Sequence, residues 1–410
     1  MNTNKLWTKD FTIITLGSVI SMLGNSLAGF AVSLFVLDYT NKPALYAVYM
    51  FLYTLPQIAA PLIAGPLMDH FSRRRTIYLL DFLSSLLYLL MGCAIYINFF
   101  NFGLLAIMTL IIGTINSAYQ VAFESFYPML ISEGYYSKAY SVSSTLDTLS
   151  TVMIPVSTFL YKSFGIFPLL LANAASFLVA ALFEVQISDV EAKKGNLSKE
   201  SYNIRAYLTD SKEGFQYLLS ERGLLRIAIF FTFLAFSGCA SSVITLPWFR
   251  ETYHDGEYIY MSVWVFMVIG RVLGGVIHYN KKMPASKKYI IAFVVYIISN
   301  TLEGCYLYTP LSVMRVCCFF IGILGTTSYN IRISATQTYI PDEMKGRYNG
   351  AFFTMNTGGA LIGELLAGLA ITYIPMRTSI SLFMGVTVIA AFVIIGGGKQ
   401  QIEPIYNRNT

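Results

Sequence analysis

Roughly twelve stretches of 20 or more mainly apolar residues follow one another along this 410-residue chain. A bilayer has a hydrocarbon core about 30 Å thick, and a helix needs about 20 apolar residues to cross it. In lipid, only helices and closed barrels satisfy their own backbone groups. The chain is therefore expected to be an all-α integral membrane protein. The expected spans are residues 11–37, 44–69, 76–98, 102–131, 139–161, 164–186, 223–249, 257–279, 288–308, 311–334, 347–374 and 378–398.

The distribution of basic residues predicts the orientation of these spans. If both termini are cytoplasmic, 21 of the 28 Lys and Arg residues lie in cytoplasmic segments and four lie in outer loops. Cytoplasmic loops of membrane proteins carry such an excess of Lys and Arg. We expect a multi-pass protein of the plasma membrane with cytoplasmic N- and C-termini. Because the positive charge sorts by membrane side, nucleic acid is not an expected partner.

The order of spans and loops suggests two halves. Six spans precede a polar stretch and six follow it, and Phe126-Tyr127-Pro128 after the fourth span matches Tyr339-Ile340-Pro341 after the tenth. We predict a six-helix bundle over residues 1–187, a linker over residues 188–222 with an amphipathic helix on the cytoplasmic face, and a second six-helix bundle over residues 223–410. Internal repeats of this kind are typical of secondary transporters.

Several motifs in register resemble those of the major facilitator superfamily, and within it the drug:proton antiporter branch with macrolide-efflux and siderophore-export proteins. They are Asp69 with Arg73 and Arg74, then Asp81, the segment Glu213–Leu218, and the segment Pro341–Arg347. The resemblance implies alternating access, a substrate site between the halves, and the proton gradient as energy source with no bound cofactor. Two features depart from the antiporter pattern: the fourth span has no arginine, and the glycine-proline signature of the fifth is reduced to Ile154-Pro155-Val156.

The segment after the second span is a candidate gating motif, formed by Gly65, Asp69, Arg73 and Arg74. A carboxylate at a helix end can cap the N-terminus of a neighbouring helix, and in the resembling family that neighbour is the eleventh helix. Gly65 allows close helix approach. The alternative is that the arginines only obey the positive-inside rule.

Charged residues inside spans are costly and mark functional sites. Glu124 and Asp147 lie eight to nine residues from the cytoplasmic ends of their spans, and Arg271 lies at a similar depth. We predict that Asp147 and Arg271, with Glu124 nearby, form a proton-sensitive latch between the halves. A permanent structural ion pair is the alternative.

Three further charges lie in the second half. Glu303 and Arg315 are each six residues from Thr309 in a hairpin turn, so they are predicted to form a structural ion pair. Glu364, beside Gly363, is a second candidate for binding a proton or a cationic substrate. Its alternative is a neutral glutamic acid with a hydrogen-bonded neighbour.

Other function classes lack their signatures. His70, His254 and His278 are scattered, no HExxH motif or metal-ligand spacing occurs, and no nucleotide-binding glycine loop is present. We therefore expect no enzyme and no metal, and a functional monomer. The high content of Phe and Tyr favours a hydrophobic or amphipathic small molecule, and the family resemblance implies that it is exported in exchange for protons. Facilitated diffusion or proton-coupled import of a small nutrient, and a non-transporting receptor on the same fold, are the alternatives.

Overall fold

The computed structural model describes residues 5–57, 72–99, 101–132, 139, 142, 153, 156–188, 204–280 and 283–408. These residues form helices and connecting turns, with no strand among them. Nine of their helices are long and apolar enough to cross a membrane. The prediction of an all-α membrane protein is confirmed. The predicted spans 44–69 and 139–161 fall partly outside the described residues.

The chain divides into two compact units. Unit 1 comprises residues 1–41 and 52–208, and unit 2 comprises residues 42–51 and 209–410. Two helices are shared between these ranges, α2 (Pro43–Thr54) and α9 (Ile204–Ser220). The helix expected within the linker is thus present as α9, and the division between the units falls inside it.

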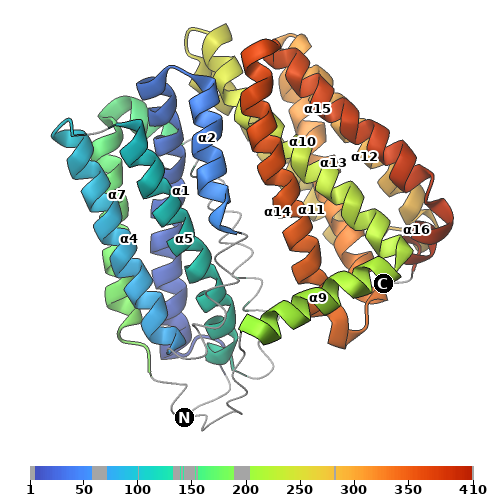
Figure 1. Cartoon of the computed structure of the whole chain (residues 1–410), viewed down its shortest axis with the longest axis horizontal. Coiled ribbons are helices and arrows are strands. Elements are labelled where there is room, and N and C mark those ends of the chain that lie inside the picture. The colour runs from blue at the N-terminus through green and yellow to red at the C-terminus, as the bar shows by residue number, and fades with distance from the viewer. Residues whose placement is uncertain are drawn as a thin grey trace. The chain divides into compact units, whose positions relative to one another are not determined.

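The helices of unit 1 run side by side as a bundle (Figure 1). They are α1 (Lys9–Thr40), α4 (Arg73–Tyr96), α5 (Phe102–Phe126), the short 3-10 helix η1 (Tyr127–Leu130) and α7 (Ile166–Glu184). Side chains of Thr8, Ser72 and Asn101 cap the first turns of α1, α4 and α5 by accepting hydrogen bonds from backbone N–H groups. Phe11 and Phe126 are fully buried between these helices.

From residue 209 on, unit 2 is a second bundle, coloured green to red in Figure 1. Its elements are α10 (Arg222–Thr252), α11 (Gly256–Asn280), η2 (Ala285–Lys287), α12 (Lys288–Cys305), η3 (Tyr306–Tyr308), α13 (Leu311–Tyr339), α14 (Asp342–Tyr373), α15 (Met376–Ala390), the π-helix η4 (Ala391–Gly396) and α16 (Lys399–Tyr406). Pro310, Pro341 and Pro375 precede α13, α14 and α15, where a missing N–H costs nothing and the fixed φ suits a helix start.

Aromatic side chains form part of the buried core of unit 2. Phe230, Tyr296, Tyr348 and Tyr406 are at most 1% exposed and belong to one cluster. The Tyr296 and Tyr406 hydroxyls lie 2.9 Å apart in a hydrogen bond. The short helix α16, which the hydropathy pattern does not predict, is fixed on the bundle by this contact.

Candidate functional site

Glycines set the spacing of the helices that form the site in unit 2. A Cβ at Gly270 of α11 would collide with the Phe319 carbonyl of α13, and a Cβ at Gly322 of α13 would collide with the Met267 carbonyl of α11. Backbones in lipid approach this closely only where side chains are small. The Thr326 hydroxyl donates to the Arg271 carbonyl across the same contact, at 3.2 Å. Arg271 is therefore held on a rigid helix pair.

A second glycine contact joins the other wall. Gly359 and Gly363 of α14 lie against the carbonyls of Thr232 and Phe236 of α10, with no room for a Cβ at either position. Their spacing is the GxxxG pattern of close membrane helices. The two helix pairs, α11 with α13 and α10 with α14, frame the space between them.

That space is a cavity of about 870 Å³ lined only by residues of unit 2. Its volume lies within the range of roughly 300–1,000 Å³ typical of small-molecule sites. Its wall combines aromatic side chains with a few polar groups, in the pattern typical of ligand sites. The charged and amide side chains of the wall are Arg271, Asn300, Glu303, Arg332 and Asn356, and Ser241, Ser242 and Trp264 also line it.

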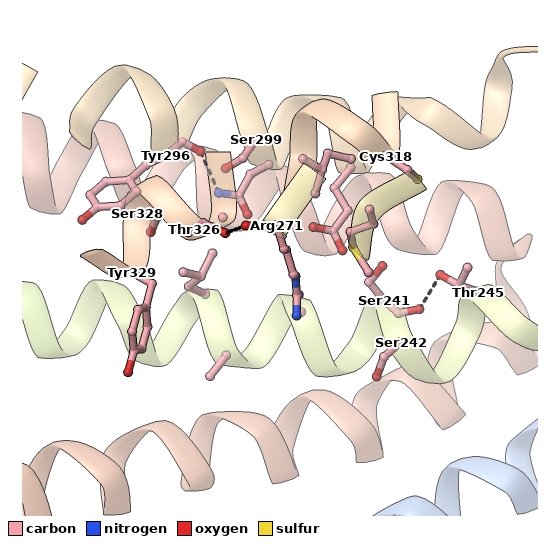
Figure 2. A pocket seen from close by; sticks show the side chains of 18 of the residues that line it. Ser241, Ser242, Thr245, Arg271, Tyr296, Ser299, Cys318, Thr326, Ser328 and Tyr329 are labelled. Carbon is pink, nitrogen blue, oxygen red and sulfur yellow. Dashed lines mark hydrogen bonds between the residues drawn. The ribbon is translucent and has the colours of Figure 1, made fainter. Parts of the chain in front are cut away.

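Arg271 extends from α11 into this cavity (Figure 2). The Glu303 carboxyl interacts with the Ser241 hydroxyl and lies within electrostatic range of Arg271. Glu303 of α12 and Arg271 of α11 therefore bring opposite charges to the cavity wall.

The predicted ion pair between Glu303 and Arg315 is not formed. Arg315 donates to the Ser262 hydroxyl of α11 at 3.0 Å, and the Glu303 carboxyl interacts with Ser241 instead. Equal distance from the hairpin turn places both residues at similar depth, but it does not fix which side of each helix they occupy. Glu303 instead lines the cavity.

Arg332 is the second cation of the wall. Its guanidinium carbon lies 4.6 Å from the ring centre of Phe352, 5.1 Å from that of Phe231 and 5.4 Å from that of Tyr329. These rings belong to α14, α10 and α13, so three helices enclose one cation. Such contacts are worth roughly 0.5–2 kcal/mol each, more where water is excluded.

Glu364 is 3% exposed and sits at the α10–α14 contact, one residue after Gly363. Cys239 of α10 is within electrostatic range of its carboxyl. Glu364 does not line the cavity in unit 2. Its proposed part in proton or cation binding stays a prediction.

The predicted gate and latch fall largely outside the described residues: Gly65, Asp69, Asp147 and the side chain of Glu124 are not described. Of the gate, Arg73 donates to the Met129 sulfur at 3.4 Å, and Arg74 donates to the Val185 carbonyl just after α7. The two arginines therefore contact other parts of unit 1. The gating role and the Asp147–Arg271 latch stay predictions.

Unit 1 contains two buried acids that are not among the predicted intramembrane charges. Asp81 of α4 and Glu184 of α7 are 1% and 0% exposed, and their carboxyl groups lie within hydrogen-bonding reach of each other. The Tyr119 hydroxyl of α5 donates to Glu184 Oε1 at 3.3 Å. Carboxylates only accept hydrogen bonds, so two that share one require a proton. The signal in the sequence was the polar residue Asp81 within an apolar stretch.

Two compact helical units with membrane-length helices, and a solute-sized cavity within the second, define a polytopic membrane protein of the transporter type. The chain matches the Major Facilitator Superfamily over residues 14–364. It belongs to that family of transporters, which are not enzymes. Its place in the drug:proton antiporter branch stays a prediction.

A relative from Bacillus subtilis (strain 168), the uncharacterized MFS-type transporter YkuC, is 21% identical over 250 residues. The match covers 60% of this chain and 57% of YkuC, little more than half of that protein.

Solved structures share the fold at low identity. The nucleoside transporter NupG has a TM-score of 0.66 at 13% identity, over 97% of this chain and 99% of that one, and a mutant of it has a TM-score of 0.69 at 12% identity, over 94% and 99%. A bacterial homologue of the iron transporter ferroportin, in an inward-facing state, has a TM-score of 0.66 at 13% identity, over 96% and 98%.

Proposed function

We propose that this transporter exports a hydrophobic or amphipathic small molecule in exchange for protons, by alternating access. The observation that carries the proposal is the cavity of unit 2, about 870 Å³ in volume, with aromatic side chains and a few polar groups on its wall. A drug-sized molecule with one polar end matches that volume and that lining.

The buried acids of unit 1 support the coupling to protons. Asp81 and Glu184 lie within hydrogen-bonding reach and are enclosed by protein. At the end of α7, Arg74 donates to the Val185 carbonyl, and Asp10 accepts from the Ser188 N–H at 3.0 Å. Among the described residues, the Tyr119 hydroxyl donates to this pair, and a proton shared between the two carboxyl groups would complete it.

The same proposal includes the oligomeric state, the membrane, the orientation and the energy source. It works as a monomer in the plasma membrane, with cytoplasmic termini, and uses the proton gradient with no bound cofactor. The excess of Lys and Arg in the expected cytoplasmic segments supports this orientation.

Proton-coupled import of a small polar nutrient is a second candidate function. Asn300, Asn356 and Ser241 give the cavity wall amide and hydroxyl groups that suit a hydroxylated solute. The similarity in fold to the nucleoside transporter NupG supports this second candidate.

The test is transport by the purified full-length protein in liposomes that contain a pH-sensitive dye, under an imposed pH gradient and with a panel of amphipathic compounds. We expect at least one compound to trigger proton movement in the direction opposite to its own. Compound movement without proton movement would contradict the exchange mechanism. Movement of protons and a nucleoside in the same direction would establish the importer.

A further inference from the structure

We propose that Arg332 binds the anionic group of the transported molecule, so that the substrate class is an amphipathic monoanion such as an aryl or alkyl carboxylate. The inference rests on the proposed transport function and narrows its substrate. It starts from the aromatic enclosure of Arg332 by Phe231, Tyr329 and Phe352, in the wall of the unit 2 cavity.

The enclosure leaves the hydrogen-bonding capacity of Arg332 unused. A guanidinium has five N–H donors. Aromatic faces attract its positive charge, but they do not provide the oxygen or nitrogen acceptors that N–H groups normally bond. Within the described part of the chain, Arg332 has no salt bridge and no hydrogen-bond acceptor, and its Nε is enclosed without a partner. Arg332 is half-buried and lines the cavity, so its remaining N–H donors are open to an acceptor that enters the cavity.

Three other arginines of unit 2 have structural roles, because each bonds to a protein acceptor on another element. Arg226 donates to the Ile394 carbonyl at 3.2 Å, Arg250 pairs with Glu257 at 2.8 Å, and Arg315 donates to Ser262 at 3.0 Å. Each ties two elements together through a protein acceptor. Arg332 differs from all three because the space it faces is the cavity.

The charges of the cavity wall favour a ligand with one negative charge and disfavour a cationic ligand. The charged side chains lining the cavity are Arg271, Glu303 and Arg332. Glu303 lies within electrostatic range of Arg271 and offsets its charge, which leaves Arg332 to attract a ligand. The wall remains cationic whether or not Glu303 is ionised, so a cationic solute is disfavoured, and a polyanion would lack enough counter-charges.

The rest of the wall suits an apolar body attached to that anion. Trp264, Met267 and Phe353 line the same cavity as Arg332. Aromatic and thioether side chains adapt to flat or irregular apolar groups. A carboxylate on the planar guanidinium can form two parallel hydrogen bonds, which would orient the molecule with its apolar part along this surface.

The experiment compares three probes that differ only in the polar end: 2-naphthoxyacetate, its neutral amide, and the corresponding 2-naphthoxyethylamine cation. Binding to the full-length protein in phosphatidylcholine nanodiscs is measured by titration calorimetry at pH 7.4. We expect the carboxylate to bind roughly tenfold or more tightly than the amide, as charge-assisted hydrogen bonds are stronger than neutral ones. Equal binding of acid and amide, tighter binding of the amine, or no binding of any probe would overturn the proposal.

Variants then assign the preference to one residue. In Arg332→Gln the acid and the amide should bind within about twofold of each other, while Arg332→Lys should keep part of the preference, since lysine retains the charge without the planar fork. Arg315→Gln is the matched control, because Arg315 lies on the same helix and does not line the cavity. A preference that persists in a folded Arg332→Gln protein, or that Arg315→Gln removes equally, contradicts the assignment. If Arg332→Gln does not fold, an undiminished preference in Arg332→Lys counts against it.

Transport separates this inference from the function on which it rests. Binding of the acid that depends on Arg332, without flux into liposomes, would refute the transport of this class while keeping the anion site. Flux of the amide at the same rate as the acid would keep the transporter and refute the anionic substrate.

Discussion

Each unit contains one group of ionisable side chains that the proposed function uses, and the two groups lie in different surroundings. In unit 1, Asp81 and Glu184 are enclosed, at 1% and 0% exposure, and are within reach of each other. In unit 2, Arg271, Glu303 and Arg332 line a cavity of about 870 Å³. Two bundles of the same helical kind therefore provide one closed acidic pair and one open cationic wall. The proposed function assigns the proton to unit 1 and the solute to unit 2.

The largest effect is expected from the packing that holds the wall of unit 2 open. Gly270→Val would force a side chain into the Phe319 carbonyl, and overpacking of this kind costs about 1–3 kcal/mol or more. We expect thermal unfolding of the detergent-purified protein to shift down by several degrees, and ligand binding to be lost. Gly275→Val on the same helix is the control, since a Cβ there meets nothing within 4 Å. Equal shifts in both variants would show that helix propensity, and not the contact, sets the effect.

A second change tests the acidic pair of unit 1. In Asp81→Asn the neighbouring Glu184 can still be charged, but the pair can no longer take up and release a shared proton. We expect substrate-triggered proton flux in liposomes to fall about tenfold or more, while passive substrate equilibration continues. Asp10→Asn serves as the control, because Asp10 accepts a backbone hydrogen bond from Ser188 at the end of the bundle. Unchanged proton flux in Asp81→Asn would remove the pair from the mechanism and the main contrast between the units with it.

A third change sharpens the cationic character of unit 2. Glu303→Gln removes the negative charge within range of Arg271 and keeps the shape of the side chain. The wall then has two uncompensated arginines, so the affinity for 2-naphthoxyacetate should rise by roughly 3- to 10-fold, in line with a charge interaction of about 1 kcal/mol in partly hydrated protein. A lower affinity would mean that Glu303 orders the wall more than it repels the anion. Calorimetry with the neutral amide, which should be indifferent to the change, is the control.

The smallest effect is expected at the surface of unit 2. Glu213 of α9 and Arg347 of α14 form an ion pair at 3.2 Å, with side chains 44% and 36% exposed. Exposed pairs of this kind contribute roughly 0.2–1 kcal/mol because water and salt screen them. A double-mutant cycle with Glu213→Gln and Arg347→Gln, read from thermal unfolding, should give a coupling at or below that range. A much larger coupling would mean that this contact stabilises α9 on the bundle.

The sequence predicted the helical membrane class because twelve apolar stretches leave a chain no other way to satisfy its backbone in lipid. It also predicted the helix in the linker, which the structure shows as α9. It did not predict the partners of charged side chains. Glu303 and Arg315 have the right spacing along the chain, but Arg315 turns to Ser262 on α11. Asp81 and Glu184 are about a hundred residues apart, and only the packing of α4 on α7 brings them together.

Arg332 was misjudged from the sequence for a different reason, which is an error in a helix boundary. The expected tenth span ends at residue 334, which places Arg332 near the membrane surface, where an arginine needs no explanation. The helix α13 in fact continues to Tyr339. Arg332 therefore lies seven residues, or about two turns, inside the end of the helix. An error of five residues in one boundary changes this arginine from an interfacial anchor to a binding candidate.

The glycine contact between α11 and α13 also bears on how this protein can evolve. Any base change in a glycine codon that alters the residue introduces at least one extra carbon, and at Gly270 and Gly322 that carbon would meet backbone of the opposite helix. Side chains can be exchanged one mutation at a time, whereas this spacing cannot be widened in small viable steps. New substrate preferences should therefore arise by replacing residues such as Arg332 and Glu303, and lineages that diverge in specificity should retain the same two glycines.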